Sequence, residues 1–192
     1  SIKERDADQA SVPAPLSAVV SLRALELDEL RRRIKGRSKD IILALDHITD
    51  PRNLGAIVRS AAFFGVKEIL VPERRQVLLT QAAVNTAQGG FALTDIFVTV
   101  NLNRALEELK DSGYWVIGAA MGGEPLPDLA KTYDRVVIVL GSEDTGLSKQ
   151  VLEKCDRIAA IAGRGAGLDS LNVSVAAGIF LCEFTKVEAA TP

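Results

Sequence analysis

Two loops of this sequence place polar side chains directly after apolar runs. In "LALDHITDPRNLGAIVRSA", Asn53 and Arg59 follow the run that ends at Asp46. In "VVIVLGSEDTGLS", an apolar run ends at Gly141, and Glu143 comes two residues later. A glycine at such a point lets a ligand approach the backbone closely, because it has no Cβ atom. Amide, guanidinium and carboxylate groups in these loops can hold and orient a polar ligand.

Each of these residues also has a purely structural interpretation. Asn53 can be the N-cap of a helix that begins near Leu54, and Arg59 a solvated residue two turns into it. Glu143 is equally well a cap for the next turn or an acceptor directed at a site. His47 is interpreted as a strand-end residue rather than a catalyst, because the sequence shows no partner for it.

A third loop, "IAGRGAGLDSLNVSVAAG", carries Ser170 and Asn172 at the start of a helix. Free backbone N–H groups and polar side chains at such a start can face a ligand. Capping uses only one of the two, so the structural alternative makes Ser170 the N-cap and Asn172 a first-turn residue. Its glycines are spaced G-x-G-x-G, which differs from a dinucleotide-binding loop, and no strand follows them. Arg164 in this loop is interpreted as a solvated charge rather than a phosphate contact.

Short apolar runs alternate with helical patterns from residue 41 onward, which is typical of strands buried on both faces of a parallel sheet. The predicted strands cover residues 41–46, 67–71, 95–100, 114–120, 135–141 and 157–162. The predicted helices begin near Leu54, Leu79, Asn103 and Ser148, and a last one runs from Leu171 to about Lys186. The fold class is α/β, with a mostly parallel sheet flanked by helices. Ligands of such sheets bind beyond the carboxyl ends of the strands, where the three loops lie.

Composition narrows the class of protein. The 192 residues are 47% hydrophobic and carry a formal net charge of −2, so a nucleic acid would have to bind a local basic patch. Cys155, Cys182 and the single His47 fit neither a zinc site nor a disulfide framework, and the two cysteines are predicted to be buried, reduced thiols. No membrane span or signal peptide is recognisable, so we expect a soluble, cytoplasmic protein that needs no metal.

Three regions are expected along the chain. Residues 1–40 read as an extension, a linker or the remnant of something larger, residues 41–187 as the main domain, and residues 188–192 as a tail. Within the first region, the basic stretch "LRRRIKGRSK" (30–39) is either a source of phosphate contacts or a solvated helical face.

The three loops, in this order and at these separations, resemble the three motifs of the SpoU/TrmH branch of the SPOUT RNA methyltransferases. The resemblance runs from about Ile41 to Phe184. The residues that carry it are Asn53, Arg59, Gly141, Glu143, Ser170, Leu171 and Asn172. By this resemblance, residues 1–40 would be the remnant of an RNA-binding domain and residues 41–187 the catalytic domain.

The resemblance implies a homodimeric ribose 2′-O-methyltransferase that uses S-adenosylmethionine and acts on structured RNA, with ribosomal RNA slightly preferred over transfer RNA. It also implies a deep trefoil knot formed by the C-terminal segment. The cofactor would lie against Ala119, Gly141, Ile161 and Leu171. The sequence departs from the family pattern in "IAGRGAGLDSLN", which lacks the usual Ile-Pro pair and has one extra residue, so the contact of Ile161 shifts by about one position.

Methyl transfer to a hydroxyl group requires in-line alignment of three atoms. Arg59 is the residue that the resemblance points to at the acceptor, and a guanidinium with a pKa above about 12 is not a general base. We therefore expect Arg59 to bind a phosphate or the developing alkoxide, with Asn53, Glu143, Ser170 and Asn172 as its positioning partners. The alternatives are a catalytically idle RNA-binding relative and an unrelated nucleotide-binding enzyme that uses the glycine loop.

Overall fold

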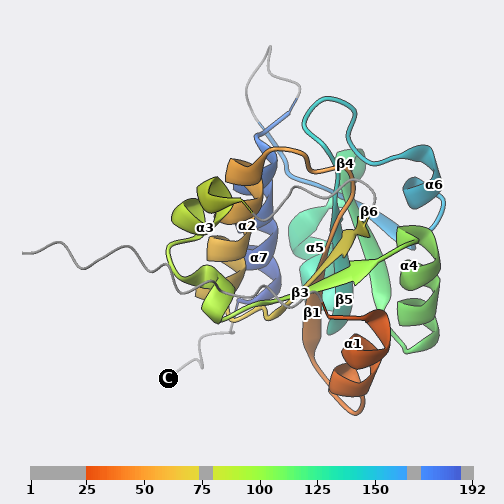
Figure 1. Ribbon diagram of the computed structural model, residues 1–192. Helices are drawn as coiled ribbons and strands as arrows, with labels where there is room; N and C mark the ends of the chain where they lie inside the picture. The colour runs from red at the N-terminus through yellow and green to blue at the C-terminus, as the bar shows by residue number, and fades with distance from the viewer. Residues whose placement is uncertain (1–24, 74–79, 164–169, 187–192) are drawn as a thin grey trace, which may run out of the picture.

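A computed structural model describes residues 25–73, 80–163 and 170–186, and the sheet lies at its centre (Figure 1). Six strands are ordered β3-β2-β1-β5-β4-β6, and every pairing between them is parallel. Their bounds are β1 (Asp40–Leu45), β2 (Glu68–Pro72), β3 (Asp95–Thr99), β4 (Trp115–Pro125), β5 (Arg135–Leu140) and β6 (Arg157–Ala160). The predicted mostly parallel α/β sheet is confirmed, and β4 is longer than the apolar run that predicted it.

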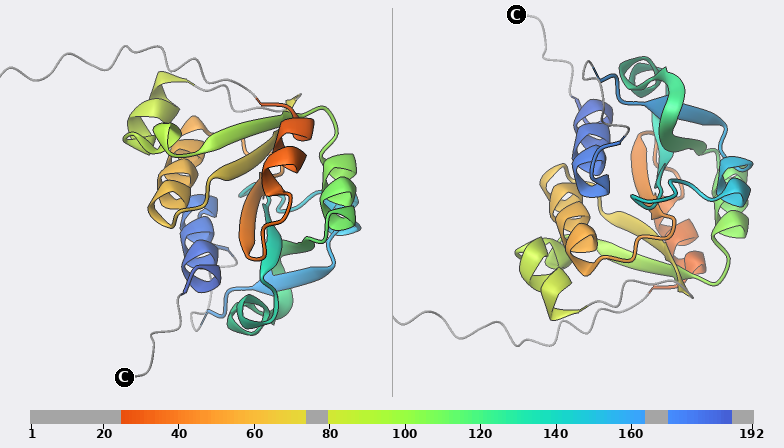
Figure 2. Two further views of the ribbon diagram at one scale, coloured as in Figure 1. Left: turned by 90° about the horizontal axis from the view of Figure 1, so that it is seen from below. Right: turned by 90° about the horizontal axis from the view of Figure 1, so that it is seen from above.

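Helices cover both faces of the sheet (Figure 2). They are α1 (Leu27–Ile34), α2 (Pro51–Phe63), α3 (Gln81–Ala87), α4 (Leu102–Asp111), α5 (Leu126–Thr132), α6 (Lys149–Leu152) and α7 (Val173–Phe184), with a 3-10 turn η2 (Gly90–Ala92). One core cluster joins the sheet to α2, α3, α5 and α7, and a second joins it to α1, α4 and α6. The sequence analysis did not predict α5. In the described ranges, no helix is long and apolar enough to cross a membrane.

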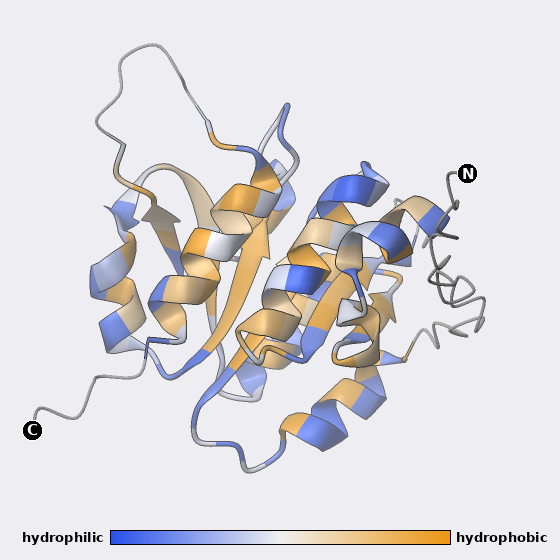
Figure 3. Ribbon diagram, turned by 90° about the vertical axis from the view of Figure 1, so that its left-hand side faces the viewer, coloured by the Kyte–Doolittle hydropathy of each residue, from blue (hydrophilic) through white to orange (hydrophobic). Residues whose placement is uncertain are grey.

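The strands at the centre of the sheet are apolar on both faces, as Figure 3 shows by hydropathy. In β1, Leu43 belongs to the cluster below α2 and α7, whereas its neighbour Ile42 belongs to the cluster below α1 and α4. Alternate residues of a strand point to opposite faces, so a parallel strand covered on both sides has to be apolar throughout. This is why continuous apolar runs located the strands in the sequence.

Several residues of the basic segment 30–39 pack in the core or form ion pairs within the domain. Leu30 and Ile34 of α1 are buried in the second core cluster, and Leu25 pairs with Phe97 of β3. Arg33 forms ion pairs with Glu29 and Asp95. The alternative of a wholly solvated helical face is therefore wrong for this arginine, because its charge holds α1 against β3.

A polar network joins the starting ends of the strands. Arg37 donates from Nη1 to Asp40 Oδ1 at 2.9 Å and from Nη2 to Glu68 Oε1 at 2.8 Å. The hydroxyl group of Tyr114 donates to the other oxygen of Asp40. The bond to Glu68 raises the pKa of Arg37, while burial and the bond to Asp40 raise that of Tyr114. Glu68 is only 3% exposed, so Arg37 neutralises a carboxylate that water does not reach.

Replacing Arg37 by alanine is expected to lower the free energy of unfolding by about 2 kcal/mol, because it leaves the Glu68 carboxylate buried without its partner. Urea denaturation measures this change. Arg104→Ala is the matched control, since Arg104 is an exposed arginine paired with Glu108 on the surface of α4, and we expect a change below about 0.5 kcal/mol there. Equal changes in the two variants would show that the buried ion pair contributes no more to the free energy of unfolding than the exposed one.

The two cysteines differ in exposure. Cys155 is partly buried, and burial raises the pKa of its thiol to about 11. Cys182 is exposed on α7, so the prediction of two buried thiols is wrong for this residue. The reason lies in α7, whose sequence "VSVAAGIFLCEF" is apolar on nearly all sides, so its periodicity does not indicate which face packs on the sheet.

Candidate active site

The three loops found in the sequence meet at the carboxyl edge of the sheet. The loop after β1 leads into α2, the loop after β5 contains Glu143, and the third loop leads into α7. Helices α2 and α7 lie side by side with their N-terminal ends at this edge (Figures 1 and 2). This arrangement brings the polar residues of all three loops to one end of the molecule.

Asn172 connects the three loops. Its Nδ2 donates to Asn53 Oδ1 at 3.1 Å and also to Glu143 Oε1. The backbone N–H of Val173 donates to the same Glu143 oxygen at 3.3 Å. Asn172 Oδ1 meanwhile accepts the N–H of Ser174 at 2.9 Å, which makes Asn172 the N-cap of α7. We call Asn53, Glu143 and Asn172 the polar cluster.

Asn53 does not cap its helix, so the structural alternative for this residue is wrong. The N-cap of α2 is Asp50, whose side chain accepts the N–H of Arg52 at 2.8 Å, and Pro51 is the first helical residue. Asp followed by Pro is a strong signal for a helix start, so the helix predicted from Leu54 begins three residues earlier, at Pro51. Asn53 instead lies in the first turn, 9% exposed, with its side-chain oxygen bonded to Asn172.

Ser170 likewise does not act as the N-cap that the structural alternative assigned to it, because Asn172 has this role. α7 begins at Val173 rather than at Leu171. Ser170 and Leu171 precede the helix and are both exposed, Leu171 by 47%. Arg164 and most of the glycine loop lie outside the described residues.

The loop after β5 folds back on itself and directs Glu143 towards α7. Ser142 and Gly146 exchange two backbone hydrogen bonds, of 3.1 and 2.9 Å. A Cβ atom at Gly141 would overlap the backbone of Gly146 and Leu147. A glycine is therefore required at position 141, because the loop passes close to its own backbone there. Glu143, two residues later, accepts hydrogen bonds at the start of α7. The bonds of Glu143 run to the start of α7, and the N-cap of the following helix α6 is Ser148. That Glu143 is an acceptor for a ligand stays a prediction.

The side chain of Arg59 projects from a different side of α2 than the side chain of Asn53, which belongs to the polar cluster. It follows Asn53 by six residues, which is about 240° around a helix of 3.6 residues per turn. Gly90 packs closely against its backbone, since an added Cβ there would lie 3.2 Å from the Arg59 Cα. The side chain is exposed, and in the described part of the chain no carboxylate forms an ion pair with it. Its positive charge is thus available to an anion.

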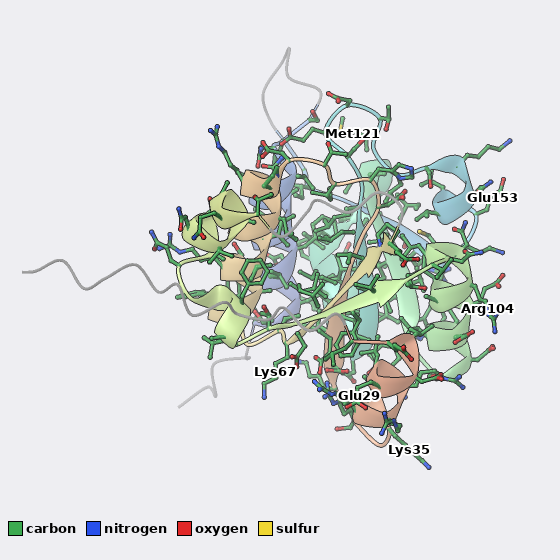
Figure 4. All side chains as sticks on the ribbon, in the orientation of Figure 1. Glu29, Lys35, Lys67, Arg104, Met121 and Glu153 are labelled. Carbon is green, nitrogen blue, oxygen red and sulfur yellow. The ribbon has the colours of Figure 1, made fainter. Side chains whose placement is uncertain are left out.

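The residues that the resemblance assigned to the cofactor occupy the same edge. Ala119 of β4 and Ile161 after β6 are partly buried, and Gly141 directly follows β5. Between Ala119 and Glu124 the register of β4 against β6 shifts, so that both residues pair with Ala159. The intervening Met121 is exposed at this end of the molecule (Figure 4). Backbone groups beside exposed apolar side chains such as Leu171 suit a nucleoside, which has an apolar face and a polar edge.

His47 has a partner that the sequence did not reveal. Its Nδ1 is hydrogen-bonded to the carboxylate of Asp46, and its backbone has a positive φ of 62°. In the sequence, Asp46 is the end of a predicted strand, and a carboxylate in place of an apolar residue is the one signal that marks it. The backbone N–H of Ser148 donates to the same carboxylate at 2.7 Å. The sequence predicts Ser148 only as a helix start and gives no sign of this contact.

Comparison with known proteins gives consistent matches. A model of the SpoU rRNA methylase family matches residues 40–182. An uncharacterized tRNA/rRNA methyltransferase of Mycolicibacterium paratuberculosis is 42% identical over 159 residues, which are 83% of this chain and 51% of that relative.

Solved structures are also similar. The AdoMet-bound rRNA methyltransferase of Sinorhizobium meliloti has a TM-score of 0.73 at 26% identity, over 84% of this chain and 60% of that one. An RNA 2′-O ribose methyltransferase has a TM-score of 0.67 at 26% identity, over 77% of this chain and 56% of that one. The chain spans about half the length of the curated relatives that it matches. Because the family model covers well over half of the chain, this protein belongs to the SpoU rRNA methylase family.

Proposed function

We propose that this protein transfers the methyl group of S-adenosylmethionine to a ribose 2′-hydroxyl in structured RNA. The observation that carries the proposal is the polar cluster, in which hydrogen bonds join Asn53, Glu143 and Asn172 from three separate loops. The similar structure with bound AdoMet supports the cofactor, and the similar RNA 2′-O ribose methyltransferase supports the position of methylation. Ribosomal RNA is the preferred substrate class, with transfer RNA as the other candidate.

The chemistry divides between cofactor and protein. The sulfonium of S-adenosylmethionine supplies the methyl group, and it would lie against the backbone near Ala119, Gly141, Ile161 and Leu171. The polar cluster orients the ribose, with Ser170 beside it, because a fixed geometry removes the entropic cost of alignment from the transfer step. Arg59 binds the phosphate of the target nucleotide or the developing alkoxide. The 2′-hydroxyl proton leaves to water or to a phosphate oxygen as the O–C bond forms and the C–S bond breaks.

The proposal includes a homodimer with a C-terminal trefoil knot. Exposed apolar side chains support the dimer: Phe63 of α2, Val175 of α7 and Leu171 beside the polar cluster. The chain order is consistent with the knot: β6 is an edge strand beside β4, and the chain returns from it to α7, which lies against α2, α5 and β5. Light scattering of the purified protein tests the dimer, since it gives the mass in solution.

RNA phosphates are proposed to bind a basic groove of about 850 Å³ beside α1. Arg31, Arg32, Lys35 and Arg135 line it, together with Glu26 and Asp28. Within the described residues, the Nε of Arg135 is buried without a hydrogen-bond partner. Lys35 lies at the end of the molecule opposite Met121 (Figure 4). The groove is therefore far from the polar cluster, and an RNA that reaches both would have to extend along the domain.

Replacing Arg32 and Lys35 together by alanine is expected to weaken RNA binding severalfold at low salt and to reduce the slope of log Kd against log salt by about 1 to 2. Filter binding at several salt concentrations measures both values. The expected change is the same for every RNA sequence, because phosphates carry no base identity. An unchanged slope would exclude these side chains as phosphate contacts.

The direct test of the proposed function is incubation of the protein with labelled S-adenosylmethionine and total bacterial RNA, followed by mapping of the methylated nucleotide. Incorporation at a ribose 2′-oxygen of one nucleotide is the expected result and names the substrate. Incorporation on a base would contradict the ribose assignment. RNA binding without S-adenosylmethionine binding would favour an idle RNA-binding relative.

A further inference from the structure

Asp46 is a buried carboxylate at the carboxyl edge of the sheet that the proposed chemistry does not use. It follows β1 directly and is 2% exposed. Its backbone N–H donates to Leu140 O at 2.8 Å, so it extends the pairing of β1 with β5 by one residue. A carboxylate at a buried position requires hydrogen-bond donors that compensate for the loss of water.

Both carboxylate oxygens of Asp46 have such donors. Oδ2 accepts the backbone N–H of Ser148 at 2.7 Å, and Oδ1 is paired with Nδ1 of His47. Ser148 ends the loop that begins at Gly141, and it is the residue from which α6 starts. Asp46 thus attaches the C-terminal end of the loop 141–148 to the end of β1. The N-terminal end of the loop continues directly from β5.

Glu143 projects from this loop. Apart from its own bonds to Asn172 and Val173, its position depends on two sets of bonds, the internal pairing of Ser142 with Gly146 and the closure at Ser148. The first set shapes the loop but does not attach it to the rest of the molecule. The closure ties the loop to the end of β1 by a hydrogen bond, next to Leu147, which is buried in the same core cluster as β1. The residues that follow β1 lead to Asn53. The same loop begins at Gly141, where the cofactor is proposed to lie.

His47 adds a second observation. It adopts a φ of 62°, a left-handed conformation that costs free energy for a residue with a side chain. Such a conformation persists where surrounding bonds over-determine it, and here the bond to Asp46 does so. The backbone after β1 is therefore held by the same carboxylate that holds the loop after β5.

We propose that Asp46 is a positioning residue, which joins residues 141–148 to the end of β1 and so sets both the cofactor contact at Gly141 and the direction of Glu143. This inference rests on the proposed function for its catalytic consequence. Asp46 acts through Ser148 and Glu143 and does not itself touch the reacting atoms.

Three variants test this role. Asp46→Asn weakens the closure by removing the charge. Ser148→Pro removes the N–H donor together with a hydroxyl group that makes no cap hydrogen bond to α6. The backbone suits the change, because Ser148 has φ −62° and ψ 150°, values that proline adopts. Asp40→Asn is the matched control: Asp40 begins the same strand, and its carboxylate is also nearly buried and bonded twice, to Arg37 and Tyr114. It lies at the opposite end of the sheet.

We expect Asp46→Asn and Ser148→Pro each to raise the Kd for S-adenosylmethionine about tenfold in calorimetry and to lower kcat about tenfold, with no further loss when they are combined. Asp40→Asn should lower stability to denaturant without changing either value. Kd and kcat within twofold of wild type in both variants, or a loss in Asp40→Asn equal to theirs, would overturn the proposal.

Hydrogen exchange separates this inference from the proposed function. Faster exchange of the Ser142 and Gly146 amides in Asp46→Asn and Ser148→Pro, but not in Asp40→Asn, is expected even if the wild-type protein methylates no RNA. Unchanged exchange at both amides would overturn the closure itself. A wild-type protein that binds no S-adenosylmethionine would refute the proposed function, and the exchange data would still decide the role of Asp46 in holding the loop.

Discussion

Arg59→Ala is expected to reduce the rate of RNA methylation by about 100- to 1000-fold, while the Kd for S-adenosylmethionine stays unchanged. The guanidinium is exposed at α2 and carries a charge that no carboxylate of the described residues neutralises. In its proposed role this cation meets the negative charge that develops on the 2′-oxygen, which is larger in the transition state than in the bound substrate, so its loss lowers kcat more than it weakens binding. Single-turnover methylation and calorimetry give the two values.

Two further variants sharpen this test. Arg59→Lys keeps the charge but loses the planar fork of donors, so a rate between those of wild type and Arg59→Ala is expected. Arg104→Ala removes an exposed arginine from α4, which packs on the opposite face of the sheet from α2, and should leave the rate unchanged. Loss of cofactor binding in Arg59→Ala, or a rate within a few-fold of wild type, would remove Arg59 from the proposed chemistry.

Asn172→Asp is expected to lower the methylation rate by about 100-fold with little loss of stability. The new carboxylate cannot donate to Asn53, and it lies against Glu143, so the polar cluster is forced apart. A displacement of about 1 Å at a reacting group costs a factor of this size. The retained oxygen still accepts the N–H of Ser174, and aspartate is as good an N-cap as asparagine.

A matched control exists for this change. Asn101 is the N-cap of α4 and accepts the N–H of Arg104 at 3.1 Å, so Asn101→Asp makes the same substitution at a cap outside the polar cluster. Its activity should equal that of wild type. If Asn172→Asp loses stability but not activity, the polar cluster serves the fold alone, and the proposed role of Asn172 is wrong.

Sequence alone determined the fold class and the family. Strands such as β1 and β5 are continuous apolar runs because helices cover both faces of the sheet, so they are visible without any alternation. The three loops were located for a related reason, since polar residues directly after a buried strand have to lie at its carboxyl edge. The types and order of those residues then carried the resemblance that the family model confirms.

Only the tertiary structure decided which side chains meet and what each one does. The local pair Asp50-Pro51 can exclude Asn53 as the cap of α2, but nothing local shows which side chain Asn53 meets. Its partner Asn172 is 119 residues away. The same holds for Asp46, whose partner Ser148 is 102 residues away. The exposure of Cys182 depends on how α7, apolar on nearly all sides, turns against α2 and the sheet. Local sequence determines propensity, whereas these pairings arise from packing between elements that are distant in the chain.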